Sequence, residues 1–142
     1  ERSGGVPLLL FKDICFDGKH TKADIEDLIS GKGGLYSYLG TTDCIEIEKR
    51  ISAGDERARI VYKAMGYQIA KSIAEMSVAL KGSVDAIILT GGLANSKMLT
   101  NIIKEYAGHL GKIVLMPGAN ELEALAAGAN RMLIGEEIAR EY

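Results

Sequence analysis

Apolar residues in the first half of the chain recur at steps of three and four, between polar and glycine-rich breaks. Residues 6–16 place Phe11, Ile14 and Cys15 at helical spacing behind Pro7. An apolar run of this length fits a strand or a buried helix, but this spacing and the early proline favour a short helix.

Polar residues and glycines predict where the next helices begin and end. Thr21 and Asp24 have the spacing of a capping box, so we expect a helix that starts there and ends at Gly31. Residues 31–42 are interrupted by glycines, and the pattern assigns them no element. Either Thr42 or Asp43 would then cap a helix that carries isoleucines at 45, 47 and 51.

A long helix is expected from Gly54 and Asp55 to about Leu80, a length of roughly 39 Å at 1.5 Å per residue. Its apolar positions step by three and four: Ala58, Val61, Met65, Ile69, Ser72, Met76 and Ala79. Only a narrow strip is polar, so we predict that the helix is mostly buried against a sheet or another domain.

The last third of the chain predicts a strand–helix–strand–helix order. Residues 84–90 form a continuous β-branched and aliphatic run, typical of a central parallel strand. Asn95 or Ser96 would cap a helix that reaches Tyr106. A second strand over 112–116 and a helix from about residue 120 complete a right-handed parallel unit.

Length and composition predict one compact globular domain, with two small domains as the alternative. The 142 residues are 47% hydrophobic and 25% charged, and a chain of this mass can bury about 68% of its surface. The apolar runs fall short of the ~18 residues of a membrane span, and a net charge of −2 favours neither nucleic acid nor an anionic membrane as partner. We expect a cytoplasmic protein. The start at Glu1, without methionine, suggests a fragment of a longer chain.

Cysteines and histidines offer little chemistry in this sequence. Cys15 and Cys44 are far apart, which favours buried reduced thiols over a disulfide framework or a zinc site. His20 and His109 lie in polar, turn-like stretches without a nearby ligand cluster, so we expect surface histidines.

The strongest local signal is the segment 89–97, Leu-Thr-Gly-Gly-Leu-Ala-Asn-Ser-Lys. Gly91 and Gly92 follow a buried strand, where they would let the backbone approach a ligand, and the next helix offers free N–H groups to an anion. The segment is neither a Walker A loop nor G-x-G-x-x-G. On spacing alone, a tight turn between strand and helix is favoured over a ligand site.

This segment resembles the adenosine motif of the superfamily of acetate and sugar kinases, heat-shock chaperones and actin. Within it, the chain is most similar to butyrate kinases of the acetokinase family. The stretches that carry the resemblance are 1–7 (Glu-Arg-Ser-Gly-Gly-Val-Pro), 31–35 (Gly-Lys-Gly-Gly-Leu), 39–43 (Leu-Gly-Thr-Thr-Asp), 67–71 (Tyr-Gln-Ile-Ala-Lys), 89–97 and 117–126 (Pro-Gly-Ala-Asn-Glu-Leu-Glu-Ala-Leu-Ala). They span nearly the whole chain in family order and match the later part of such an enzyme.

The resemblance implies an α/β fold, a partial ribonuclease-H-like, actin-type ATPase domain that is helix-rich with a small parallel sheet. Residues 1–142 would be the C-terminal nucleotide-binding domain of a two-domain acyl kinase, without its N-terminal domain. The implied reaction converts butanoate and ATP to butanoyl phosphate and ADP, with Mg²⁺. Homodimers, or larger assemblies, are also implied.

Site residues carried over from the family are Arg2, which would stabilise the transferring phosphoryl group, and Gly91, Gly92 and Asn95 in the nucleotide loop. Arginine's planar, always-charged fork suits phosphoryl oxygens. Without the family, Arg2 is simply an exposed terminal charge.

Three further positions have a family role, and two of them also have a simpler explanation. Thr42 and Asp43 would line the second wall of the adenosine pocket, although Asp43 is equally a helix N-cap, and Ile45 stands where relatives usually carry an arginine. Glu121 matches a glutamate near the Mg²⁺, although a carboxylate in the first turn of a helix is favoured by the helix dipole alone.

Two other functions remain open. An acetate or propionate kinase usually has an acidic residue at the position of Gly5, so the sequence favours the butyrate branch. A non-catalytic actin-like or chaperone-like nucleotide-binding module lacks the Arg-Ser-Gly stretch that begins at Arg2. Acyl chain length is left undecided, because the acyl pocket would lie largely in the other domain.

Overall fold

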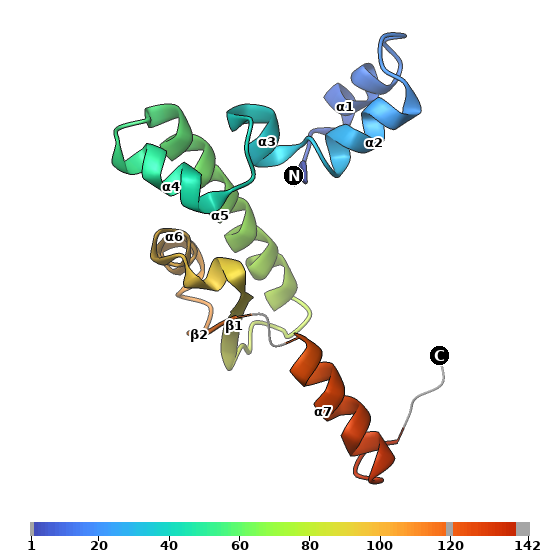
Figure 1. Cartoon of the computed structure of the whole chain (residues 1–142), viewed down its shortest axis with the longest axis vertical. Helices are drawn as coiled ribbons and strands as arrows, with labels where there is room; N and C mark the ends of the chain where they lie inside the picture. The colour runs from blue at the N-terminus through green and yellow to red at the C-terminus, as the bar shows by residue number, and fades with distance from the viewer. Residues whose placement is uncertain (1, 119–120, 139–142) are drawn as a thin grey trace.

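The computed structural model describes residues 2–118 and 121–138 of the chain. Its elements are α1 (Leu8–Cys15), α2 (Lys22–Ile29), α3 (Gly34–Leu39), α4 (Cys44–Ser52), α5 (Glu56–Ser77), β1 (Ala86–Gly91), η1 (Gly92–Asn95), α6 (Lys97–Ala107), β2 (Lys112–Pro117) and α7 (Glu121–Leu133). Figure 1 shows α5 as the central rod, with α4 beside its first half, α6 and the strands beside its second half, and α7 extending away. The predicted helix-rich fold with a small parallel sheet is confirmed.

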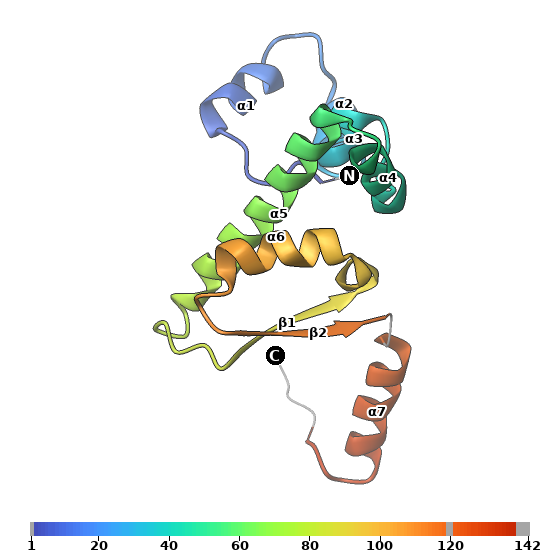
Figure 2. The same ribbon diagram turned by 90° about the vertical axis from the view of Figure 1, so that its left-hand side faces the viewer.

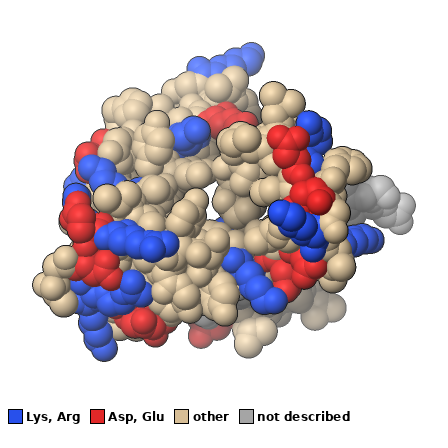
Figure 3. All heavy atoms as spheres, turned by 90° about the horizontal axis from the view of Figure 1, so that it is seen from above, with Lys and Arg blue, Asp and Glu red and all other residues tan. Residues whose placement is uncertain are grey.

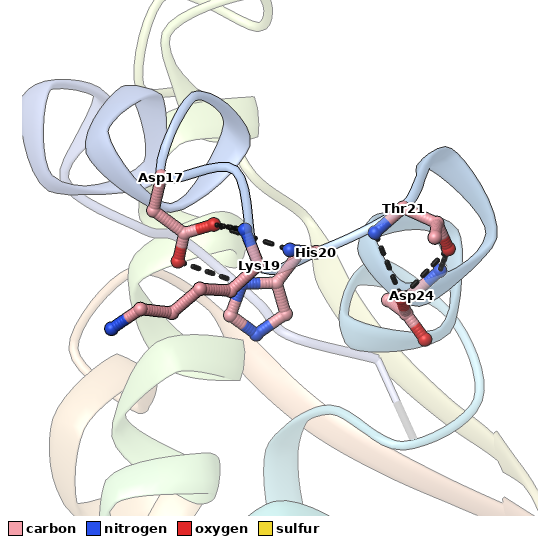
Figure 4. A network of polar contacts seen from close by, with 5 residues as sticks. All are labelled: Asp17, Lys19, His20, Thr21 and Asp24. Carbon is pink, nitrogen blue, oxygen red and sulfur yellow. Dashed lines mark hydrogen bonds and ion pairs between the residues drawn. The ribbon is translucent and has the colours of Figure 1, made fainter.

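The capping box predicted before α2 is present. The Thr21 hydroxyl accepts from the Asp24 backbone N–H at 3.2 Å, while Asp24 Oδ2 accepts from the Thr21 N–H at 2.8 Å (Figure 4). The Thr21 hydroxyl also donates to Asp24 Oδ2 at 2.7 Å, and this bond and the one from the Thr21 N–H favour the charged carboxylate and lower the pKa of Asp24. In the turn before it, Asp17 accepts from exposed His20, and His109 is exposed as well, as predicted for both histidines.

Helix α3 lies in the glycine-punctuated stretch to which the sequence pattern assigns no element. Gly34, at φ +55°, adopts a left-handed conformation at the start of the helix. A Cβ atom at Gly34 would also collide with the carbonyl oxygen of Arg2. Gly40, at φ 74°, ends the helix in the same conformation. The glycines therefore define a short helix and the close approach of the N-terminal segment, not a loop.

The buried face of α5 agrees with the predicted stripe at Ala58 and is displaced by one residue after it. Ala58, Tyr62, Gly66 and Ala70 are buried. The predicted positions 61, 65 and 69 flank the core half-buried, whereas 72, 76 and 79 are exposed. A Cβ atom at Gly66 would lie 2.6 Å from Ile102 Cγ2, so the glycine is what lets α6 pack closely on α5. The helix also ends at Ser77 and not at about Leu80.

The hydrophobic core joins α3, α4, α5 and α6. Its buried members are Leu35, Ile47, Ala58, Tyr62, Ala70, Leu99, Ile103 and Ala107. The two cysteines, expected to be buried, are only half-buried, and both are free thiols.

The two strands pair in parallel, with Ala86 opposite Lys112 and Gly91 opposite Pro117. Within the described residues β1 pairs with β2 alone, so the predicted central position of this strand is not confirmed. Ile87 is buried and Leu89 half-buried, but Ile88, on the other face, is 59% exposed. One face of the sheet therefore packs against the helices and the other is open.

The chain is more extended than a compact domain of its mass. Its accessible surface is 10,677 Å², whereas mass scaling gives about 7,100 Å² for a compact monomer. Helix α1 buries none of its residues, and the described residues of α7 bury none of their hydrophobic side chains. Figure 2 shows α1 at one end of the molecule and α7 at the other. The prediction of one compact domain is therefore wrong for this chain taken alone.

Charged residues of both signs are interspersed on the face seen from above, around a hollowed centre of uncharged residues (Figure 3). Neither sign forms a continuous patch on this face. Among the described residues, no helix combines the length and apolar character needed to cross a membrane.

Candidate nucleotide site at the end of the sheet

Gly91 ends β1 in a conformation that requires glycine. Its backbone lies at φ 78° and ψ −176°, a region that other residues essentially never adopt. Its carbonyl oxygen accepts from the Gly118 N–H at 3.3 Å, which ties the ends of the two strands together. Gly91 is thus explained by the turn itself.

Gly92 is different, because nothing in the described structure requires a glycine there. Its φ is not positive, and a Cβ atom built on it meets no atom within 4 Å. A glycine without a local conformational reason, at the carboxyl end of a parallel strand, leaves room for a ligand to reach the backbone.

The residues after Gly92 form a short 3₁₀ turn, η1, that the sequence pattern did not predict. Asn95 holds this turn closed, since its Nδ2 donates to the Gly92 carbonyl oxygen at 3.1 Å. Ser96 is the residue that caps α6, because its Oγ accepts from the Leu99 N–H at 2.9 Å. Between the two caps offered by the sequence, the structure therefore selects Ser96.

Asp43 caps α4, as one of the two sequence interpretations predicts. Its Oδ1 accepts from the N–H groups of Ile45 and Glu46, at 2.8 and 3.3 Å. Within the described residues Oδ2 accepts no hydrogen bond, so the cap leaves one oxygen available. Thr42 is exposed beside it, and Ile45 is 69% exposed in the first turn.

A side-chain network connects these two segments. Glu48, on α4, accepts hydrogen bonds from the hydroxyls of Tyr62 and Ser96. The Tyr62 ring is fully buried, whereas Glu48 and Ser96 are half-buried. The three residues are 14 to 48 positions apart, and no sequence motif connects them, so sequence reasoning did not identify them.

Arg2 lies apart from the Gly91–Gly92 turn. It is exposed, and it forms an antiparallel bridge with Ser30. Gln68, on α5, accepts from the Gly5 N–H at 3.1 Å and so holds the same segment from the other side. Arg2 lines a largely apolar cavity of about 690 Å³ with the second half of α5 and Ile87, at the beginning of β1. The structure therefore does not bring Arg2 to the glycines.

Glu121 begins α7, but its side chain lies outside the described part of the structure. The backbone still gives its approximate place. Strand β2 ends at Pro117, opposite Gly91, so α7 begins at the same edge of the sheet as the glycine turn. Figure 2 shows this start beside the ends of both strands. Among the described residues, no three His, Cys, Asp or Glu side chains gather as a metal site.

The sequence pattern of the family described as "Acetokinase family" matches residues 1–137. The chain belongs to the acetokinase family. It is 48% identical over all 142 residues to "Probable butyrate kinase" of Listeria monocytogenes serotype 4b (strain CLIP80459), and 48% identical to "Probable butyrate kinase 2" of Caldanaerobacter subterraneus subsp. tengcongensis. In both comparisons it spans 40% of the relative's length.

Two solved structures of other acyl kinases share the fold of this chain. An acetate kinase of Porphyromonas gingivalis superimposes with a TM-score of 0.77 at 21% identity, covering 91% of this chain and 39% of the other. A propionate kinase of Francisella tularensis subsp. tularensis SCHU S4 gives 0.73 at 20% identity, covering 85% and 37%. The predicted resemblance to butyrate kinases of this family is confirmed.

Proposed function

We propose that this chain supplies the nucleotide-binding half of a butyrate kinase, which converts butanoate and ATP to butanoyl phosphate and ADP. The observation that carries the reaction is 48% identity over all 142 residues to proteins named probable butyrate kinases. The observation that supports nucleotide binding by this part is the unobstructed backbone at Gly92. The acetate and propionate kinase structures are too distant in sequence to favour their own substrates.

The proposed domain is the C-terminal, ribonuclease-H-like, actin-type half of a two-domain enzyme, residues 1–142. An open sheet face and a surface about half again as large as that of a compact monomer support a second domain, which would cover part of it. That domain would provide most of the butanoate pocket. A homodimer is proposed as the assembled form, and the cytoplasm as its compartment.

The adenine and ribose of ATP would lie between the Gly91–Gly92 turn with Asn95 and the start of α4 with Thr42 and Asp43. The Oδ2 atom of Asp43 accepts no hydrogen bond from the described residues, so it is a suitable acceptor for a ribose hydroxyl. Ile45 offers an apolar surface where relatives usually carry an arginine, so any contact made by that arginine would be supplied elsewhere. A non-catalytic module remains the alternative.

The Gly92 turn gives a direct test of nucleotide binding. In the full-length protein, Gly92→Val is expected to raise the KM for ATP at least tenfold, because the side chain would fill the space left for the ligand. Circular dichroism should show an unchanged fold, since a Cβ atom at Gly92 meets no atom within 4 Å among the described residues. Gly92→Ala is the graded control, with a smaller increase. If the valine variant folds and its KM for ATP is unchanged, the segment is a turn without a role in nucleotide binding.

Mg²⁺ would be bound by the nucleotide phosphates and water, with Glu121 as the nearby carboxylate. Mg²⁺ usually takes only one or two protein carboxylates, so the lack of a cluster among the described residues fits such a site. When bound, the ion neutralises charge on the transferring phosphate.

Glu121→Gln separates the metal role from helix capping. The glutamine keeps the shape of the side chain but removes its charge. We expect a several-fold higher Mg²⁺ concentration at half-maximal rate, with little change in melting temperature. A lower melting temperature with normal Mg²⁺ dependence would support the helix-dipole explanation instead.

A further inference from the structure

The carboxylate of Glu48 connects the two segments that would enclose the adenosine of ATP. Glu48 lies on α4, one turn after the Asp43 cap. Ser96, which it contacts, is the cap of α6 and directly follows the η1 turn. Figures 1 and 2 both show α4 above the η1 turn and the start of α6.

Hydrogen-bond geometry shows that the contact is directional. Tyr62 Oη donates to Glu48 Oε1 at 2.6 Å, and Ser96 Oγ donates to the same oxygen. Each hydroxyl has only one proton. The lone pairs of Ser96 Oγ remain for the Leu99 N–H, which lies 2.9 Å away. One carboxylate oxygen thus fixes both the tyrosine and the helix cap.

The third member, Tyr62, anchors the network in the core. Its side chain is fully buried on α5, between the helices that the network joins. Burial and the hydrogen bond to Glu48 raise the pKa of Tyr62 above its ordinary value, so the phenol stays protonated and remains a donor at any physiological pH. Hydrogen bonds to a charged acceptor are stronger than neutral ones.

Resting on the proposed function, we infer that Glu48 is a positioning residue for ATP. It sets the spacing between the α4 wall of the pocket, at Asp43, and the glycine-turn wall, at Gly92–Asn95. It does so through Ser96 and Tyr62, without contacting the nucleotide itself. The expected consequence is an effect on nucleotide affinity that the butanoate affinity does not share.

The test compares variants of the full-length protein by steady-state kinetics and by calorimetric titration with ADP. Glu48→Ala and Tyr62→Phe are expected to raise the KM for ATP and the Kd for ADP about tenfold, because small misplacements of binding groups have large effects. The KM for butanoate and kcat should change less than twofold. Tyr62→Phe keeps the ring in the core, so it tests the positioning role even if Glu48→Ala does not fold.

Two controls separate positioning from stability. Glu48→Gln retains an oxygen acceptor and places its NH₂ group where Oε2 accepts no hydrogen bond within the described residues, so we expect it to retain the ATP KM within about threefold. Ile47→Val removes one methyl from a fully buried neighbour on the same helix. It should lower the melting temperature and leave the ATP KM unchanged.

Gly92→Val, measured in parallel, separates this inference from the proposed function. If it raises the ATP KM while Glu48→Ala and Tyr62→Phe do not, the positioning role is wrong and the nucleotide site stands. The inference also fails if Ile47→Val raises the ATP KM as much as Tyr62→Phe does. If none of the variants changes ATP or ADP binding, the nucleotide lies elsewhere and both proposals are wrong.

Discussion

Replacement of Arg2 by alanine in the full-length protein is expected to lower kcat by two or more orders of magnitude. Phosphoryl transfer needs little covalent help from the protein, and fixed positive charge near the transferring group supplies much of the stabilisation. The structure holds the backbone of this segment from two sides, through the bridge to Ser30 and the Gly5–Gln68 hydrogen bond. Arg2 is therefore anchored at its backbone and exposed at its side chain.

Arg2→Lys is the matched control for charge without shape. Lysine keeps the positive charge but lacks the planar fork, so little of the lost kcat should return. Rates are measured with saturating ATP and butanoate, and circular dichroism confirms the fold. A loss in kcat of less than threefold for Arg2→Ala would remove the catalytic assignment. Nucleotide affinity should stay close to normal, because Arg2 lies apart from the Gly91–Gly92 turn.

Most element positions could be predicted because their signals are local. The Thr21–Asp24 capping box and the Asp43 cap involve backbone groups within three residues, and their spacing in the sequence is enough to identify them. The two strands are likewise recognisable as short apolar runs, although β1 begins at Ala86 and not at residue 84. Local chemistry decides these features, so tertiary structure does not change them much.

The features that sequence reasoning missed depend on contacts between distant segments. Gly66 contributes almost nothing to an apolar pattern, yet a Cβ atom there would collide with Ile102 of α6. In the sequence, Gly34 is simply part of a glycine-rich stretch. Its role becomes visible only in the structure, where the Arg2 backbone packs against it. A pattern of apolar residues identifies large side chains, whereas close helix packing depends on small ones.

The candidate site shows the same division. The glycine turn and the Asp43 cap were found because their motifs are contiguous, while the Glu48–Tyr62–Ser96 network was not, because it joins three helices by single atoms. The roles of Arg2, Asn95, Thr42 and Glu121 depend on the family resemblance, and they stay predictions until the variants are measured.

The isolated 142-residue chain is expected to form no butanoyl phosphate at a measurable rate. The cavity beside Arg2 and the Gly91–Gly92 turn lie at opposite ends of β1, and both face open surface. Correct positioning of reactants contributes about 7–11 kcal/mol in well-oriented transfers. Under the two-domain proposal this chain holds only part of the site, so it would lose most of that contribution. Weak binding of adenine nucleotides is the most activity we expect.

The purified chain is incubated with butanoate, ATP, Mg²⁺ and hydroxylamine, and acyl hydroxamate is measured, with the full-length protein as the positive control. Circular dichroism shows whether the chain is folded. Hydroxamate formed by the folded chain at a rate near that of the full-length protein would show that this part contains a complete site, and the two-domain proposal would then be wrong.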